Sequence, residues 1–260
     1  MIKFFLSLFC IVSFANLKTN SIKHVLSELE KLKSGTYVVL ELDGVVFKAK
    51  DPILRRGNLQ AFNKEKKDLF DKVLLDKKGD VLKAKKHSSK LIKKIKENQD
   101  FSLVNSEVSQ VLKICKRRNL KLFLVSFEKD YPIQKNLIRN LEKNAFICSD
   151  FWPYESEQFF KLERTLAVFN SGILFLPKSN LPVHLVDFFN QQESDSKKAV
   201  FVVLNKKPFS SLSVLLIKEK ISYDIIEYTY LNDDSEPVSN NCLAKFQNLY
   251  KTKTWKEGIL

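Results

Sequence analysis

The sequence predicts an α/β protein: a doubly wound parallel sheet that carries a small helical insertion. Three continuous apolar runs begin at residues 37, 121 and 199, and patterns typical of helices separate them. Strands that are apolar along their whole length are buried on both faces, as in parallel sheets covered by helices on both sides. The chain has 260 residues, of which 44% are hydrophobic and 28% charged. This length and composition are typical of a globular protein with a sizeable core.

The first fifteen residues predict an export signal. Lys3 supplies a positive start, residues 4–14 are apolar apart from two serines, and Ser13 and Ala15 are the small residues that precede a cleavage site. This is the three-part pattern of a secretory signal peptide, and its apolar run is far shorter than the roughly 20 residues that cross a bilayer as a helix. We therefore expect residues 1–15 to be removed, and the mature protein to be exported to the periplasm or the cell exterior with no membrane span.

The other elements follow from hydrophobic periodicity and from residues that begin or end helices. The first helix is expected over 20–33 and the first strand over 37–42, and a lysine-rich, largely helical insertion follows over 48–99. The elements expected after it are a helix capped at 105–106, a strand over 121–125, a helix over 132–142, a hairpin joining 164–169 to 173–176, a helix over 181–191, a strand over 199–204, a helix over 209–219, a strand over 225–230 and a helix over 238–251. The predicted core therefore consists of residues 16–47 and 100–260.

Composition excludes several classes of function. The six glycines are spaced so that neither a dinucleotide-binding G-x-G-x-x-G nor a P-loop can be formed. The histidines form no H-E-x-x-H and the cysteines no C-x-x-C, so we expect no structural zinc site. The net charge of +14 comes mainly from lysine and accompanies no recognition motif, so no specific nucleic-acid partner is predicted.

Three cysteines would remain after cleavage, namely Cys115, Cys148 and Cys242. An oxidising compartment would permit one disulfide among them, and the sequence does not choose the pair.

Polar side chains follow the predicted parallel strands at their carboxyl ends, where open parallel sheets bind ligands. The first strand ends in Glu41-Leu42-Asp43-Gly44-Val45-Val46, the second ends at Ser126 and the third at Leu204-Asn205, while Lys178 follows the hairpin. Because parallel strands end at the same edge of a sheet, we expect Glu41, Asp43, Ser126 and Asn205 to converge.

In this order, these segments resemble the haloacid dehalogenase-like (HAD) phosphohydrolase superfamily. There, D-x-D-G-[TV]-[LV] ends the first strand, Ser or Thr ends the second, a Lys follows and an acidic pair ends a later strand; a cap is inserted just after the first motif. The similarity looks closest to a family of uncharacterised, secreted bacterial HAD-like proteins, and it extends over most of residues 20–251 through Gly172-Ile173-Leu174-Phe175, Glu227-Tyr228-Thr229-Tyr230 and Ala244-Lys245-Phe246-Gln247-Asn248-Leu249-Tyr250. It implies a HAD-like Rossmannoid core with residues 48–99 as the cap.

The resemblance implies a role for each candidate residue. The first carboxylate attacks phosphorus, Asp43 is the acid and base, and Ser126 and Lys178 hold phosphoryl oxygens. Glu41 stands where the nucleophilic Asp is expected, and its extra methylene displaces the carboxylate; a misplacement of about 1 Å can cost on the order of 10²-fold in rate. Mg²⁺ is the implied cofactor, and it would be held weakly by Glu41, Asp43 and Asn205 because Leu204-Asn205 replaces the acidic pair.

The expected function is therefore that of an exported phosphatase-like pseudoenzyme that binds phosphate-bearing or other anionic ligands. One alternative is a weak Mg²⁺-dependent phosphatase that uses Glu41 or Asp43, and magnesium binding would distinguish it. Another is a basic interaction module that acts through the insertion. The lysines of residues 83–96 predict either a solvated helix face or contact with an anionic surface or partner.

Overall fold

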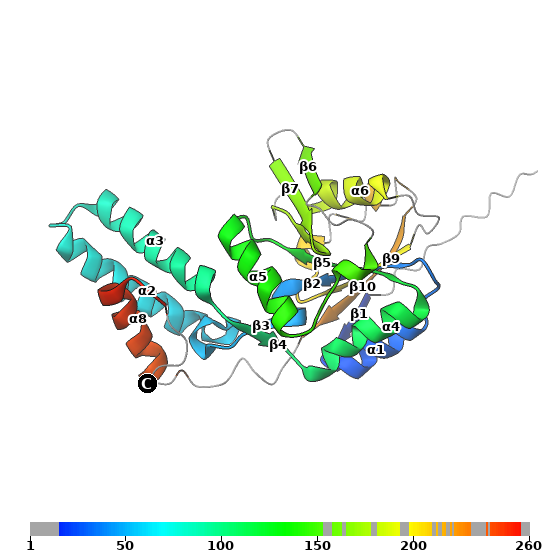
Figure 1. Ribbon diagram of the computed structural model, residues 1–260, viewed down its shortest axis with the longest axis horizontal. Coiled ribbons are helices and arrows are strands. Elements are labelled where there is room, and N and C mark those ends of the chain that lie inside the picture. The colour runs from blue at the N-terminus through cyan, green and yellow to red at the C-terminus, as the bar shows by residue number, and fades with distance from the viewer. Residues whose placement is uncertain are drawn as a thin grey trace, which may run out of the picture.

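A central sheet carries helices on both of its faces, and a helical arm extends from one side of it in the computed structural model (Figure 1). The structure describes residues 16–152, 158–162, 165–177, 181–192, 198–209, 212, 215, 216, 219, 221–229, 238 and 240–255. The expected signal peptide lies outside the described residues, and so do Lys178 and much of the helix expected over 209–219. No helix among the described residues is long and apolar enough to cross a membrane.

The sheet is mostly parallel, as the sequence predicts. Within the part of the chain that the structure describes, eight strands lie in the order β1-β10-β9-β2-β5-β8-β7-β6. Neighbouring strands from β1 to β8 in this order are parallel, and β7 and β6 are antiparallel to their neighbours. The bounds are β1 Asn16–Thr19, β10 Ser222–Tyr228, β9 Lys198–Val203, β2 Tyr37–Glu41, β5 Lys121–Ser126, β8 Ile173–Phe175, β7 Thr165–Asn170 and β6 Gln158–Leu162.

Alternate residues of the buried strands feed two separate hydrophobic cores. Val38 and Leu40 of β2 point to one face of the sheet, and Tyr37 and Val39 point to the other. The first face is covered by α1 (Ile22–Glu30), α4 (Gln110–Arg118) and α5 (Tyr131–Lys143), and the second by α6 (Leu181–Gln191). This two-faced burial explains why the strands are apolar throughout, and it confirms the predicted α/β class.

A tight turn follows β2 and leads into the insertion. Residues 42–46 form a tight turn in which Asp43 is extended and Gly44 has a φ of +84°, a left-handed conformation that favours glycine. The chain then forms β3 (Phe47–Ala49), which pairs antiparallel with β4 (Phe101–Leu103). Because these two short strands lie side by side, the segment between them leaves and re-enters the core at one place.

The insertion is helical and has a hydrophobic core of its own. Its elements are the short 3₁₀ turns Pro52–Leu54 and Arg56–Asn58 and the long helices α2 (Leu59–Asp76) and α3 (Val81–Asn98). Leu69, Val73, Leu91 and Ile95 are buried between the two helices. The pair forms the arm that projects to the left in Figure 1.

The tail helix α8 (Asn240–Thr252) belongs with this arm. Phe246, Leu249 and Trp255 are buried in the same cluster as the apolar residues of α2 and α3. The expected division assigns residues 100–260 to the sheet core, whereas the apolar side chains of α8 cluster with those of the insertion. The physical reason is that α2 and α3 alone leave an apolar surface at the base of the arm, which the tail helix covers.

Cys115 and Cys148 are buried free thiols. Burial raises the pKa of the Cys115 thiol to about 12 and also raises the pKa of the Cys148 thiol. Because the thiolate is the reactive form, both groups are poor nucleophiles in the folded protein.

Candidate functional site

Four of the five predicted site residues lie at one edge of the sheet. Strand β2 has β9 on one side and β5 on the other, and all three run in the same direction. Glu41 is the last residue of β2 and Ser126 the last of β5, while Asp43 lies in the turn over residues 42–46 and Asn205 lies two residues beyond β9. The carboxyl ends of three adjacent strands therefore bring these residues together, as the sequence predicts.

The Glu41 carboxylate joins the ends of two strands. Its Oε2 accepts a hydrogen bond from the backbone N–H of Leu204 at 2.8 Å. This N–H is the first one beyond β9, so the contact continues the link between β2 and β9 after their ladder ends. Glu41 Oε2 is therefore already engaged in a hydrogen bond that links the ends of β2 and β9.

Leu204 occupies the place next to Gly44 where the resemblance would put an acidic side chain. A Cβ added at Gly44 would lie 2.6 Å from Cδ2 of Leu204, so the leucine side chain lies directly on the glycine backbone. The neighbouring Asn205 turns its Oδ1 to accept the backbone N–H of Lys207 at 2.9 Å. At the end of β9, the site therefore offers the hydrocarbon side chain of Leu204 and the Oδ1 of Asn205, which already accepts a hydrogen bond in a local turn.

Asp43 is held in an environment that disfavours its charged form. Partial loss of hydration at the carboxyl group raises its pKa, the negative charge of Glu128 raises this pKa further, and Lys96 lowers it. Asp43 as a whole residue is exposed to solvent, so it can exchange protons with water. A carboxyl group with a raised pKa is suited to donating a proton or a hydrogen bond.

Ser126 is almost completely buried at the end of β5. Its Oγ accepts a hydrogen bond from the backbone N–H of Glu128 at 3.3 Å, and its carbonyl accepts one from Leu176 at 3.0 Å. These contacts fix the loop that leads from β5 to α5. The hydroxyl proton of Ser126 is available to an acceptor near the strand end.

Two charged pairs that the sequence analysis did not identify connect the insertion to this loop. Lys96 Nζ of α3 lies 3.3 Å from Glu128 Oε2, and Lys93 Nζ lies 3.0 Å from Asp130 Oδ1. The two lysines are three residues apart on a helix and therefore share a face, while the two acids flank one residue of a loop. The sequence holds no local signal for these pairs, because the partners are 32 and 37 residues apart.

The end of β9 lacks the acidic side chains that would hold the magnesium ion that the resemblance implies. No group of three or more His, Cys, Asp or Glu side chains able to hold a metal occurs among the described residues. Glu41 Oε2 and Asn205 Oδ1 each accept one backbone N–H group, and Leu204 offers carbon. Mg²⁺ prefers near-octahedral oxygen ligands, and the Leu204 side chain supplies none.

Comparison with known proteins places the chain in one family. A family model described as "Protein of unknown function (DUF2608)" matches residues 18–256, which covers the sheet, the insertion and the tail helix. No curated protein and no solved structure matches the chain. The match extends over nearly the whole sequence, and the chain therefore belongs to the DUF2608 family.

Proposed function

We propose that this chain is an exported HAD-like protein that binds a phosphate-bearing or other anionic ligand at the ends of β9, β2 and β5 and has lost efficient phosphatase chemistry. The observation that carries the proposal is the hydrogen bond from the Leu204 N–H to Glu41 Oε2. An oxygen that accepts this N–H is directed toward the end of β9, and its lone pair is less available for attack on phosphorus. The parallel order of the three strands and the insertion after β2 support the HAD-like part of the proposal.

Binding of an anion would use the positive and hydrogen-bonding groups near Asp43. Lys96 pairs with Glu128 at 3.3 Å and also lowers the pKa of Asp43, so its positive charge acts on the loop and the turn at the strand ends. Ser126 adds a hydroxyl group that can donate a hydrogen bond. An anionic ligand would replace Glu128 as the partner of the Lys96 ammonium group. Charge-assisted hydrogen bonds of this kind are stronger than neutral ones.

The loss of catalysis is tested with small phosphate esters in the presence of Mg²⁺. We expect turnover near background, and Glu41→Asp alone should stay there because the nucleophile and the metal act as a unit. The triple variant Glu41→Asp with Leu204→Asp and Asn205→Asp restores both parts and is the variant expected to gain turnover. Robust Mg²⁺-dependent turnover by the unmodified protein, abolished by Asp43→Asn, would contradict the proposal and establish a phosphatase.

Anion binding is tested separately by calorimetry with inorganic phosphate and with orthovanadate. Lys96→Gln removes a charged donor and should weaken binding by roughly tenfold or more. Lys90→Gln is the matched control, because Lys90 is an exposed lysine of the same helix and should leave affinity unchanged. Equal affinity in both variants would place the ligand elsewhere.

The proposal of export rests on the signal-peptide pattern of residues 1–15. Cleavage is expected after Ala15. Mass spectrometry of the protein recovered from its native cells should find Asn16 at the N-terminus, whereas a chain that retains residues 1–15 would contradict export by this signal.

A further inference from the structure

The free end of the α2–α3 arm exposes large apolar side chains to solvent. Leu75 and Leu82 are each 80% exposed and Val81 is 57% exposed. Leu75 lies in the last turn of α2, Val81 and Leu82 lie in the first turn of α3, and only the loop 77–80 separates the two helices. Exposing these groups has an unfavourable free energy in water, so a surface of this kind is typical of a contact site. We define the arm tip as residues 71–90.

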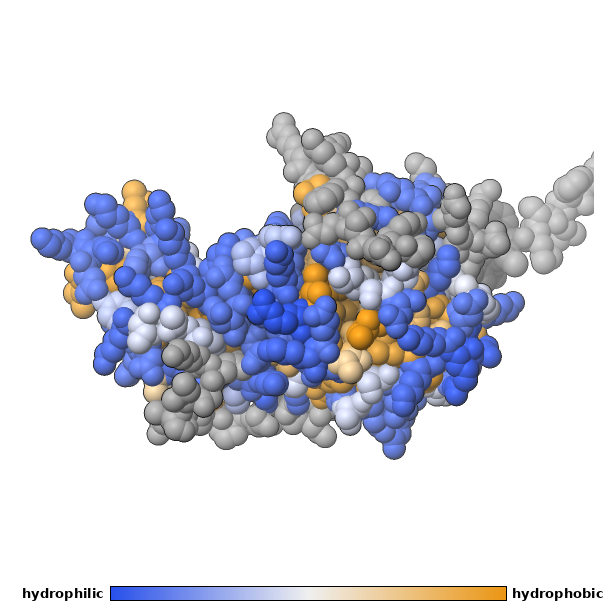
Figure 2. Space-filling view, viewed as in Figure 1, coloured by the Kyte–Doolittle hydropathy of each residue, from blue (hydrophilic) through white to orange (hydrophobic). Residues whose placement is uncertain are grey.

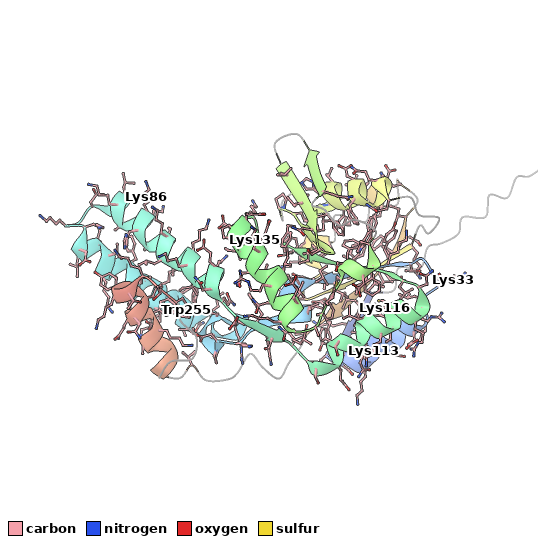
Figure 3. The ribbon with its side chains drawn as sticks, viewed as in Figure 1. Lys33, Lys86, Lys113, Lys116, Lys135 and Trp255 are labelled. Atoms are coloured by element: carbon pink, nitrogen blue, oxygen red, sulfur yellow. The ribbon has the colours of Figure 1, made fainter. Side chains whose placement is uncertain are left out.

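The arm tip is strongly basic. It contains seven lysines and three aspartates. Two of those aspartates have partners within the protein, because Asp80 caps α3 and pairs with Lys83, while Asp76 accepts a hydrogen bond from Tyr250. Apolar atoms emerge among hydrophilic ones at the end of the arm in Figure 2, and Lys86 projects from it in Figure 3.

The shape of the tip is fixed from within. Ala84, Ser88 and Leu91 of α3 are buried, and Leu69 and Val73 of α2 lie in the cluster that packs against that helix. The helical period therefore places Leu82 and the neighbouring lysines away from this interface. The loop is closed by backbone hydrogen bonds from Lys78 to Leu75 at 3.0 Å and from Gly79 to Leu74 at 3.0 Å. The exposed side chains cannot turn inward without unpacking the arm.

We propose that the arm tip docks on the surface of an anionic lipid bilayer. Lysines attract the acidic headgroups, and the leucines and the valine enter the boundary between headgroups and acyl chains, which is the combination that membrane-surface helices use. A second copy of the chain would bring two basic tips together and is disfavoured by repulsion. Nucleic acid would use the lysines and leave the leucines exposed. This surface lies away from the strand ends and does not rest on the proposed function.

The test is sedimentation of the full protein with vesicles. The probes are vesicles of equal parts phosphatidylglycerol and phosphatidylcholine, compared with vesicles of phosphatidylcholine alone. We expect binding to the anionic vesicles that salt weakens. The pair Leu75→Ser and Leu82→Ser should lower the partition coefficient by about tenfold or more. Lys85→Gln and Lys86→Gln should lower it by about fivefold for each lysine removed.

Matched controls lie at the other end of the molecule. Leu166→Ser removes a leucine of β7 that is 50% exposed, and Lys33→Gln with Lys113→Gln removes two lysines that Figure 3 shows far from the arm. These variants should bind anionic vesicles like the unmodified protein. Equal binding of tip and control variants would overturn the proposal, and so would equal binding to neutral and anionic vesicles. If only the lysine variants lost binding, the tip would be a surface that binds polyanions through charge alone. If the protein were a dimer that the leucine variants dissociate, the tip would be a site of self-association.

Discussion

At the scale of single residues, the site is governed by the charges around Asp43. Glu128 and Lys96 act on the Asp43 carboxyl group in opposite directions, and the raised pKa reflects burial first and Glu128 second. Lys96 comes from the insertion, whereas the two acids come from the sheet core. The protonation of Asp43 is therefore coupled to the position of the arm.

We predict that Asp43→Asn stabilises the protein at neutral pH. A carboxyl group whose pKa is raised on folding contributes stability below its unfolded value of 3.8, and this contribution is lost as the pH rises through the folded pKa. Asparagine never carries the charge, so the variant should have a higher free energy of unfolding than the unmodified protein at neutral pH, and the difference should vanish below the unfolded pKa. Urea unfolding from about pH 3 to about pH 8 measures this.

The exposed Asp68 of α2 supplies the control for this prediction. Asp68→Asn should change the free energy of unfolding little at any pH. If Asp43→Asn gave the same flat profile, or destabilised the protein at neutral pH, the electrostatic account of Asp43 would be wrong.

At the scale of elements, hydrophobic patterns in the local sequence predict the strands at the centre of the sheet. β2, β5 and β9 are found because each is an uninterrupted apolar run, and Asn170-Ser171-Gly172 predicts the β7–β8 hairpin. Cys148 explains why glycine is required at position 172, because a Cβ added to Gly172 would lie 2.5 Å from the Cβ of Cys148. Local sequence contains the information for all of these elements.

One strand and part of the site depend on contacts that are distant in sequence. β1 has the sequence Asn-Leu-Lys-Thr, which carries little β-propensity, and it becomes a strand through pairing with β10. Glu41, Asp43, Ser126 and Asn205 are found because they follow recognisable strands, whereas Lys96 and Glu128 meet only after the arm has folded back onto α5.

An ion pair at the base of the arm holds the tail helix. Lys245 Nζ of α8 lies 2.7 Å from Asp51 Oδ2, and the Asp51 side chain is fully buried. We predict that Lys245→Met destabilises the protein by about 3–5 kcal/mol, because it leaves a buried carboxylate without its cation. Chemical unfolding measures the loss, and faster proteolysis within α8 should accompany it.

A double variant tests the cause of this loss. Asp51→Asn with Lys245→Met removes both charges and should recover part of the lost free energy of unfolding. Lys116→Met breaks an exposed pair with Asp150 and should cost less than about 1 kcal/mol. Equal losses in Lys116→Met and Lys245→Met would show that burial of the pair is unimportant.

At the scale of the whole molecule, the described residues form three hydrophobic cores that are joined in different ways. The two cores of the sheet share the central strands and are therefore bound to one another. The described residues in the core of the arm come from the insertion and the tail. It is joined to the sheet by the β3–β4 ladder and by polar contacts such as the hydrogen bond from the Phe101 N–H to Asn140 Oδ1 at 3.0 Å.

This arrangement predicts that the arm opens without the sheet. Leu91 is buried between α2 and α3, and Leu122 is buried near the start of β5. Each substitution to alanine should cost about 2–5 kcal/mol in the core that loses the side chain. Because cooperative units open separately where few apolar contacts join them, Leu91→Ala should speed hydrogen exchange in α2, α3 and α8 and leave the amides of β2, β5 and β9 protected. Leu122→Ala should instead speed exchange throughout the sheet. Uniform loss of protection in both variants would mean that the arm and the sheet unfold as one unit. In that case, a change in the interaction between Lys96 and Asp43 would alter the stability of the whole protein and not that of the arm alone.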